Sequence, residues 1–244
     1  IACFIALRAL GIVVAMVDAT APGEELLRCA DTVGATRLVV GPERFSAERV
    51  RAVHASIRVS GHAPPRRVEL PAGTALLKLT SGSTGVPRAI ALGTRQLAAD
   101  TIQIMRTMGF GGHDVTLAAV PLTHSYGIGS CLVPLLLAGT PLVPAGVQLP
   151  AALATTLADA RVAHFPAVPA MIRALSGLQH LPRLPDLRVV LSAGAPLAPA
   201  DAATFHAITG HKVHVFYGSS ECGGISYDRS DRPAHEPGAV GTPM

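Results

Sequence analysis

The chain has 244 residues, of which 49% are hydrophobic and 15% are charged. A chain of this size can bury a large core without disulfide staples, and its four cysteines form no C-x-x-C pair. The net charge of +4 comes from scattered arginines and aromatic residues make up only 4%, which argues against a nucleic-acid-binding surface. We therefore expect a reduced, cytoplasmic protein that does not bind nucleic acid.

The apolar N-terminal stretch, residues 1–20, resembles a membrane segment in composition alone. Arg8 interrupts it and Asp18 closes it before it is long enough to cross a bilayer. It also lacks the charged start and the cleavage site of a signal peptide. We expect a helix end over 1–10, a buried strand over 12–17 and no integral membrane segment.

Buried β-type runs alternate with helix-type patterns along the rest of the chain. The first helix is expected at 22–34, with acids in its first turn and Gly34 as its stop. Further strands are expected at 37–41, 75–80, 116–121, 140–145, 163–169, 187–194 and 212–220, and further helices at 94–108, 125–138, 150–160, 169–176 and 199–208. This alternation predicts an α/β fold with parallel-rich sheets flanked by helices.

A polar, proline-bearing stretch at 61–74 interrupts this series and predicts a linker. It would separate a partial first α/β subdomain, residues 1–60, from a second subdomain, residues 75–244. Ligands of parallel sheets bind at the carboxyl ends of strands, so loops that follow the strands of the second subdomain are the places to look for a site.

The stretch LTSGSTGVPRAI, residues 79–90, is such a loop. Gly82 and Gly85 let the backbone approach a ligand closely, hydroxyl side chains surround them, and Arg88 adds a fork suited to phosphate oxygens. These residues fit a polyphosphate, but they also fit a plain solvated turn. The loop lacks the Lys-Ser/Thr pair of the P-loop pattern.

Five stretches, taken in order, resemble the adenylate-forming superfamily, which includes acyl-CoA synthetases and peptide-synthetase adenylation domains. The loop at 79–89 resembles its phosphate loop. The other four are PLTHSYGIG (121–129), VVLSAGAPL (189–197), VFYGSSECG (215–223) and PGAVGTP (237–243). The likeness covers nearly the whole chain, and five motifs in the family's order are far more specific than one. It implies a partial N-terminal domain of an adenylate-forming enzyme.

The resemblance implies an ATP site. Its residues would be Thr80, Ser81, Gly82, Ser83, Thr84, Gly85, Arg88, Gly194, Ala195, Pro196, Tyr217, Gly218, Ser220 and Glu221. Tyr217 would stack on adenine, Ser220 would donate to the α-phosphate, and Glu221 would hold Mg²⁺. Without the resemblance, the alternative for Tyr217 is a core tyrosine, a role that Phe216 beside it fits better, and Glu221 is more simply interpreted as an ordinary surface acid.

The resemblance also implies an acid-binding site made by His124, Tyr126, Gly127 and Ala193. His124 would orient the carboxylate, although a lone histidine is more often structural. Ala193 stands where many members carry glycine, so its methyl group would narrow the acyl channel. Arg88 and Ala89 replace the family's Lys-Gly. His124, Arg88 and Glu221 are the residues expected to act in catalysis.

The implied reaction is ATP-dependent activation of a carboxylic acid to an acyl-adenylate, followed by transfer to a thiol. The acceptor would be coenzyme A or a carrier protein, and the cofactors ATP, Mg²⁺ and coenzyme A. The segment 124–137 is apolar and no carboxylate occurs in the stretches expected to form the pocket. An amino acid would need one to pair with its ammonium group, so we expect a fatty or aryl acid.

Two parts of the family pattern are absent from these 244 residues: the T-G-D segment and the C-terminal domain with its catalytic lysine. Neither Lys78 nor Lys212 occupies a matching position. We therefore expect the chain to be a fragment of the large N-terminal domain and to be inactive alone. A nucleotide-binding module without turnover stays open as an alternative. An α/β hydrolase would need a G-x-S-x-G elbow, which the sequence lacks.

Overall fold

A computed structural model describes the whole chain except residues 19, 42–49, 55–56, 81–87 and 146–148. The chain divides into two compact units, Ile1–Thr94 and Arg95–Met244. A linker was predicted at 61–74 instead, and that division stays a prediction. No helix in the described part of the chain is long and apolar enough to cross a membrane.

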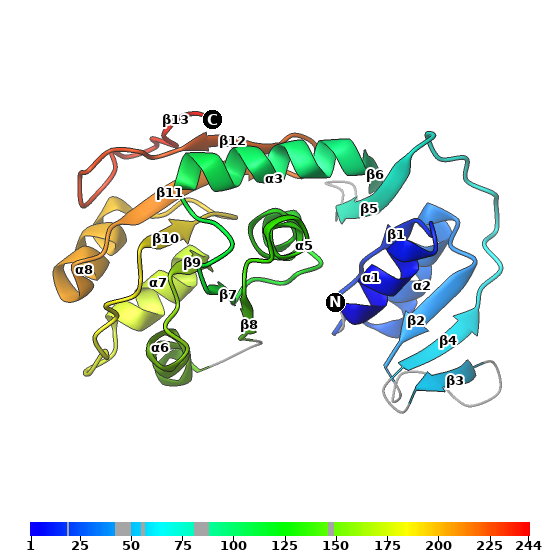
Figure 1. The fold of residues 1–244 in the computed structure, drawn as a ribbon, viewed down its shortest axis with the longest axis horizontal. Coiled ribbons are helices and arrows are strands. Elements are labelled where there is room, and N and C mark those ends of the chain that lie inside the picture. The colour runs from blue at the N-terminus through cyan, green and yellow to red at the C-terminus, as the bar shows by residue number, and fades with distance from the viewer. Residues whose placement is uncertain (19, 42–49, 55–56, 81–87, 146–148) are drawn as a thin grey trace. The chain divides into compact units, whose positions relative to one another are not determined.

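The described residues of the first unit form two small sheets and two helices (Figure 1). One sheet has the order β1-β5-β6, in which β1 pairs parallel to β5 and β6 pairs antiparallel to it; the other has the order β2-β4-β3 and is antiparallel. The elements are α1 (Ala2–Ala9), β1 (Val14–Ala15), α2 (Gly23–Val33), β2 (Arg37–Val40), β3 (Val50–His54), β4 (Ile57–Gly61), β5 (Thr74–Thr80) and β6 (Arg88–Gly93). As predicted, α2 ends at Gly34, which is left-handed at φ 64°.

The second unit is built on one seven-stranded sheet of order β13-β12-β11-β10-β9-β7-β8. The strands β11, β10, β9, β7 and β8 run parallel, and β12 and β13 are antiparallel additions at one edge. The strands are β7 (Thr116–Ala118), β8 (Leu142–Pro144), β9 (His164–Ala167), β10 (Val189–Ser192), β11 (Val213–Ser219), β12 (Gly223–Tyr227) and β13 (Thr242–Pro243).

Helices cover both faces of this sheet (Figure 1). The helical elements are α3 (Thr94–Met108), α4 (Ser125–Gly127), the π-helical turn η2 (Ile128–Leu132), α5 (Val133–Ala138), α6 (Pro150–Asp159), α7 (Pro169–Ser176) and α8 (Pro199–Thr209). Successive side chains of a strand point to opposite faces. In β10, Val190 therefore packs in the cluster that contains residues of α6, α7 and α8, whereas Val189 and Leu191 pack in the cluster that contains Ile104 of α3.

The expected α/β fold with a mostly parallel sheet is confirmed, but three features differ from the expectation. The antiparallel strands β3, β4, β6, β12 and β13 were not predicted. They are short or lie at sheet edges, where a period-2 pattern is weak. The single helix expected at 125–138 is three consecutive pieces, α4, η2 and α5. The expected strand at 12–17 shortens to Val14–Ala15.

Candidate active site

A cavity of about 490 Å³ opens in the second unit at the carboxyl ends of β10 and β11. Its walls come from five segments far apart in the sequence: α3, the stretch that contains α4 and η2, the turn after β10, the strands β11 and β12, and the loop at 235–240. Four of these segments contain motifs that the sequence analysis singled out. The location follows the general rule that parallel sheets place ligand sites at their carboxyl edge.

One side of the cavity is formed by the turn that follows β10. Gly194 is left-handed at φ 84°, and a methyl group there would meet only the Val168 side chain, at 3.8 Å. Backbone conformation, not crowding, is thus what favours glycine at this position. Gly194, Ala195 and Pro196 are exposed at the cavity wall, as a turn that presents its backbone to a ligand should be.

Neighbouring aromatic residues of β11 have opposite surroundings. Phe216 is 7% exposed and packs in the core cluster of α3, whereas Tyr217 is 49% exposed at the cavity. The alternative that Tyr217 is a core residue is therefore wrong, because the core position belongs to Phe216. An exposed ring at the end of a parallel strand is free to stack on a flat ligand. Gly218 and Ser220, which follow it, also line the cavity.

The motif after β7 meets the motif after β11 at the cavity wall. The Ser125 Oγ donates to the Ser220 Oγ at 2.8 Å, across 95 residues of sequence. His124 is exposed, lines the cavity and precedes α4, and its backbone carbonyl accepts from the Ile128 N–H. This backbone bond fixes the main chain of His124 at the cavity wall.

Tyr126 and Ala193 form the apolar middle of the wall. Burial raises the pKa of the Tyr126 hydroxyl well above its usual range, and the nearby Cys131 raises it further. The hydroxyl lies near the Ala167 backbone, yet it makes no hydrogen bond of normal geometry within the described structure. Ala193 is 7% exposed and also lines the cavity. Gly127 does not line it: a methyl group there would meet the Pro121 carbonyl oxygen at 2.2 Å, so Gly127 supports the wall from behind.

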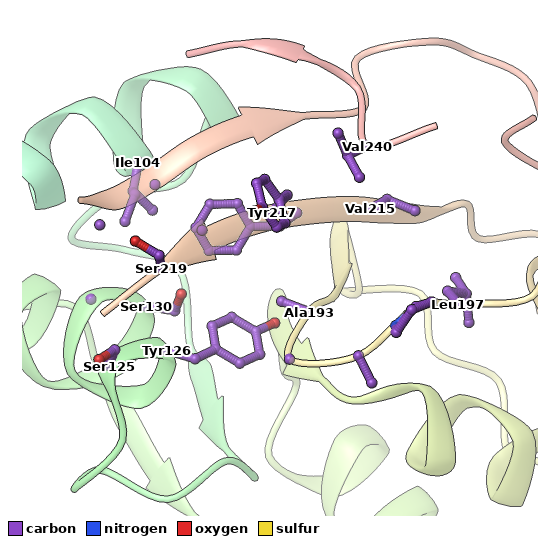
Figure 2. Close-up of a pocket in the computed structure, with 18 of the residues that line it drawn as sticks. Ile104, Ser125, Tyr126, Ser130, Ala193, Leu197, Val215, Tyr217, Ser219 and Val240 are labelled. Carbon is purple, nitrogen blue, oxygen red and sulfur yellow. The ribbon is translucent and has the colours of Figure 1, made fainter. Parts of the chain in front are cut away.

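The opposite side of the cavity is formed by α3 and η2. Figure 2 shows Ile104 and Ser130 on this side, and Leu197 and Val240 across the cavity. Ser130 is fully buried and its Oγ has no partner within the described structure. Asp100, one turn before Ile104, also lines the cavity and accepts from the Gly224 N–H at 2.8 Å.

Asp100 is a carboxylate at the cavity, although the stretches expected to form the pocket contain none. Asp100 belongs to none of those stretches, because α3 carries none of the family motifs. Ile104, Ser130, His235 and the segment 238–240 were likewise not predicted as wall residues. The one available signal was the helical spacing of Asp100 and Ile104, which places both on the same face of α3.

Glu221 lies in the turn between β11 and β12 and is exposed. It is not one of the residues that line the cavity, although its neighbours Ser219 and Ser220 are. No group of three acidic, histidine or cysteine side chains within the described residues could hold a metal by itself. A single exposed carboxylate still fits Mg²⁺, which binds proteins through one or two carboxylates and takes its other ligands from phosphates and water.

The predicted phosphate loop belongs to the first unit. Thr80 ends β5 and Arg88 begins β6, and the two residues pair across the antiparallel ladder. The two strands therefore pair up to these two residues. The expected ligands Ser81, Gly82, Ser83, Thr84 and Gly85 lie outside the described residues.

Lys212 has a structural partner. Its Nζ lies 2.9 Å from Asp228 Oδ2 and also donates to Ser230, and both members of the ion pair are nearly buried. Burial alone would raise the pKa of Asp228, but hydrogen bonds from Lys212 and Ser230 outweigh it, so the pKa lies below its usual value. The pair ties the start of β11 to the segment after β12, and the expectation that Lys212 is not the catalytic lysine stays a prediction.

A family model described as AMP-binding enzyme matches residues 1–244. The chain belongs to the AMP-binding enzyme family. Among curated relatives, this AMP-binding protein is 31% identical over 227 residues to a feruloyl-CoA synthase of Amycolatopsis sp, covering 86% of the chain and 45% of that protein. It is 28% identical over 208 residues to sulfoacetate–CoA ligase of Cupriavidus necator, covering 84% and 40%. The chain thus spans less than half the length of these relatives.

Solved structures agree with this family. The amide bond synthetase McbA from Marinactinospora thermotolerans superimposes with a TM-score of 0.73 at 25% identity, covering 93% of the AMP-binding chain and 49% of McbA. Apo MatB from Rhodopseudomonas palustris matches with a TM-score of 0.63 at 24% identity, covering 75% and 36%. The predicted resemblance to adenylate-forming enzymes is therefore confirmed.

Proposed function

We propose that the protein to which this chain belongs activates a carboxylic acid with ATP and transfers the acyl group to coenzyme A. The observation that carries this proposal is the cavity at the carboxyl edge of the large sheet. It gathers residues of four motif stretches, 124–126, 193–197, 215–220 and 238–240, around one space of about 490 Å³. Relatives named as CoA ligases support the same class of reaction.

The proposed chemistry needs no nucleophile from the protein. A carboxylate oxygen of the acid attacks the α-phosphorus of ATP, the bond from that phosphorus to the bridging oxygen breaks, and pyrophosphate leaves with the electron pair. Catalysis of this kind depends on positioning and on neutralising charge at the phosphate oxygens. A thiolate then attacks the acyl carbon and AMP leaves. A carrier-protein thiol in place of coenzyme A is the alternative acceptor.

On this proposal different residues bind the adenine, the phosphates and the carboxylate. Tyr217 stacks on adenine beside the backbone of Gly194–Pro196, Ser220 donates to the α-phosphate, and His124 orients the carboxylate. The loop from Thr80 to Arg88 would bind the other phosphates. Glu221 would hold Mg²⁺, which when bound neutralises phosphate charge.

The middle of the cavity suits the apolar part of a fatty or aryl acid. Tyr126, Ala193 and Phe216 present largely apolar surface there, and burial of such surface is worth roughly 25 cal/mol per Å². We propose an acid of this type. The expected inactivity of residues 1–244 alone and the cytoplasmic location stay predictions.

Acid-dependent exchange of labelled pyrophosphate into ATP tests the proposal. The full-length protein should catalyse exchange with at least one fatty or aryl acid. Glu221→Gln should lower Mg²⁺-dependent exchange about a hundredfold, by analogy with the loss of one charge-stabilising group in a transition state, and should leave metal-free nucleotide binding nearly unchanged. ATP binding without exchange for any acid would favour the nucleotide-binding module instead.

A further inference from the structure

Asp100 is a carboxylate in the wall of a largely apolar cavity. Its neighbours there are Ile104, the backbone of Gly223 and Gly224, and Gly129. A methyl group on Gly223 would lie 2.3 Å from Asp100 Oδ1, and one on Gly129 would lie 3.7 Å from Oδ2. Glycine at 223 therefore leaves the space in which the carboxylate sits, whereas a methyl group at 129 would make only ordinary contact with it.

One of the two carboxylate oxygens is committed to the protein. Asp100 Oδ1 accepts from the Gly224 N–H at 2.8 Å. Within the part of the chain that the structure describes, Oδ2 accepts no hydrogen bond and no lysine, arginine or histidine pairs with Asp100. Asp100 Oδ2 therefore keeps its acceptor positions for groups outside the protein.

A second polar group on the same side of the cavity also lacks a partner. Ser130 is 0% exposed, and its Oγ makes no hydrogen bond to any described residue. In Figure 2 the Ser130 oxygen lies on the same side of the cavity as Ile104, which is one helical turn from Asp100. Buried polar atoms are nearly always hydrogen-bonded, so the unpartnered Ser130 Oγ, on the same side of the cavity as Asp100, points to a polar group of a ligand.

We propose that Asp100 selects acids whose acyl portion carries a hydrogen-bond donor, a hydroxyl or an amine. This inference rests on the proposed function, because it assigns the ligand of the same cavity. The donor gives its hydrogen to Asp100 Oδ2, and the acceptor position on Ser130 Oγ provides a second contact. Acids that end in an ether or a plain hydrocarbon leave Oδ2 unsatisfied.

The alternative role for Asp100 is structural. Its bond to the Gly224 N–H links α3 to β12, and that link alone could account for a carboxylate at this position. Asparagine separates the two roles. Its side-chain oxygen can still accept from Gly224, which leaves the amide NH₂, a donor, in place of Oδ2.

The first measurement uses the unmodified full-length protein and a series of aryl acids on one scaffold. The acids carry hydrogen, hydroxyl, amino or methoxy at the position furthest from the carboxyl group, and their binding is measured by isothermal titration calorimetry. The hydroxyl and amino acids should bind at least tenfold more tightly than the methoxy acid, because a site built for a donor rejects an analogue that lacks one. Equal affinities across the series, or no binding by any member, would overturn the inference.

The second measurement repeats the series with Asp100→Asn. The order should invert, so that the methoxy acid, an acceptor, binds more tightly than the hydroxyl acid. Asp159→Asn, which removes the same charge from an exposed position at the end of α6, should keep the original order. An unchanged order in Asp100→Asn would assign Asp100 the structural role alone.

Pyrophosphate exchange, measured with the same acids, tests acid activation separately from the role of Asp100. Exchange at similar rates with all four acids would support acid activation and contradict the role of Asp100. Tight, donor-selective binding without exchange would support Asp100 and contradict acid activation.

Discussion

The wall of the cavity is mainly backbone on one side and mainly side chain on the other. At the turn after β10, Gly194 provides a left-handed backbone and Ala195 and Pro196 have little side chain to offer. Across the cavity, α3 and η2 present Asp100, Ile104 and Ser130 (Figure 2). A backbone wall can hold a ligand common to a whole family, whereas side chains can change what the site accepts without changing the fold.

The largest expected effect on ATP affinity comes from changing the backbone of the turn after β10. Gly194→Ala should lower ATP affinity about five- to thirtyfold, because the left-handed conformation costs roughly 1–2 kcal/mol for alanine and the turn would relax away from the nucleotide. Gly210→Ala is the matched control: Gly210 is also left-handed at φ 75°, ends α8, and a methyl group there meets nothing within 4 Å in the described structure.

Calorimetric ATP titration and urea unfolding of both glycine variants check this prediction. Both should lose similar stability, and only Gly194→Ala should lose ATP affinity. If both bind ATP as the unmodified protein does, the turn after β10 does not contact the nucleotide.

The two neighbouring aromatic residues of β11 are expected to differ in role, one binding ATP and the other packing in the core. Tyr217→Ala should weaken ATP binding about tenfold, since stacking on a base is worth roughly 1–3 kcal/mol, while the half-exposed ring contributes little to stability. Phe216→Ala should instead destabilise the protein by about 3–4 kcal/mol, as expected for a buried phenylalanine. Loss of stability without loss of ATP affinity in Tyr217→Ala would assign its ring a packing role.

Ala193 lies in the apolar middle of the cavity wall, where its side chain limits the width of the cavity. Ala193→Val should weaken acid binding about fivefold, with ATP affinity unchanged, because added methyl groups in a packed wall cost roughly 1–3 kcal/mol. Ala202→Val adds the same volume in α8, in the core cluster on the other face of the sheet, and should not affect acid binding. Titration of an aryl acid into both variants tests this, and equal losses would indicate a general packing defect.

The smallest expected effect concerns the sheet that supports both sides. His164 is fully buried in β9, stacks on Phe110, and burial lowers its pKa to about 3. The unfolded chain takes up a proton near pH 6.5, so the unfolded state binds more protons between pH 6.5 and 3, and stability falls as the pH falls through this range. His164 should account for a loss of about 0.7 kcal/mol between pH 7 and pH 6.

Urea unfolding at pH 7 and pH 6 measures this difference. His164→Gln should be less stable overall but should lack this part of the pH dependence. The donor selectivity of Asp100 should be the same at both pH values, because the sheet stays folded. A pH dependence that is identical with and without His164 would contradict the prediction.

Most of the fold of the second unit was predictable from local pattern. The helix expected at 94–108 coincides with α3, and the strands expected around 116, 164, 189 and 213 all occur. Each of these segments is long or strongly apolar, so its period is decided by its own residues. The antiparallel strands β12 and β13 were missed because they are short and are defined by pairing with β11 and with each other.

The family, and the turn after β10 and the end of β11 as places to look for a site, were predictable from local sequence. Glycines, hydroxyls and a tyrosine at strand ends can be recognised from the sequence around them, because their role depends on backbone conformation and on their position after a strand. The side that contains Asp100 was decided only by tertiary structure. Asp100 is an ordinary helical residue in sequence, and it becomes a cavity carboxylate because α3 packs on the sheet through Ile104 and Met108 and brings it to Gly224, 124 residues away. No local pattern encodes such a contact, since it depends on how two elements distant in the chain pack together.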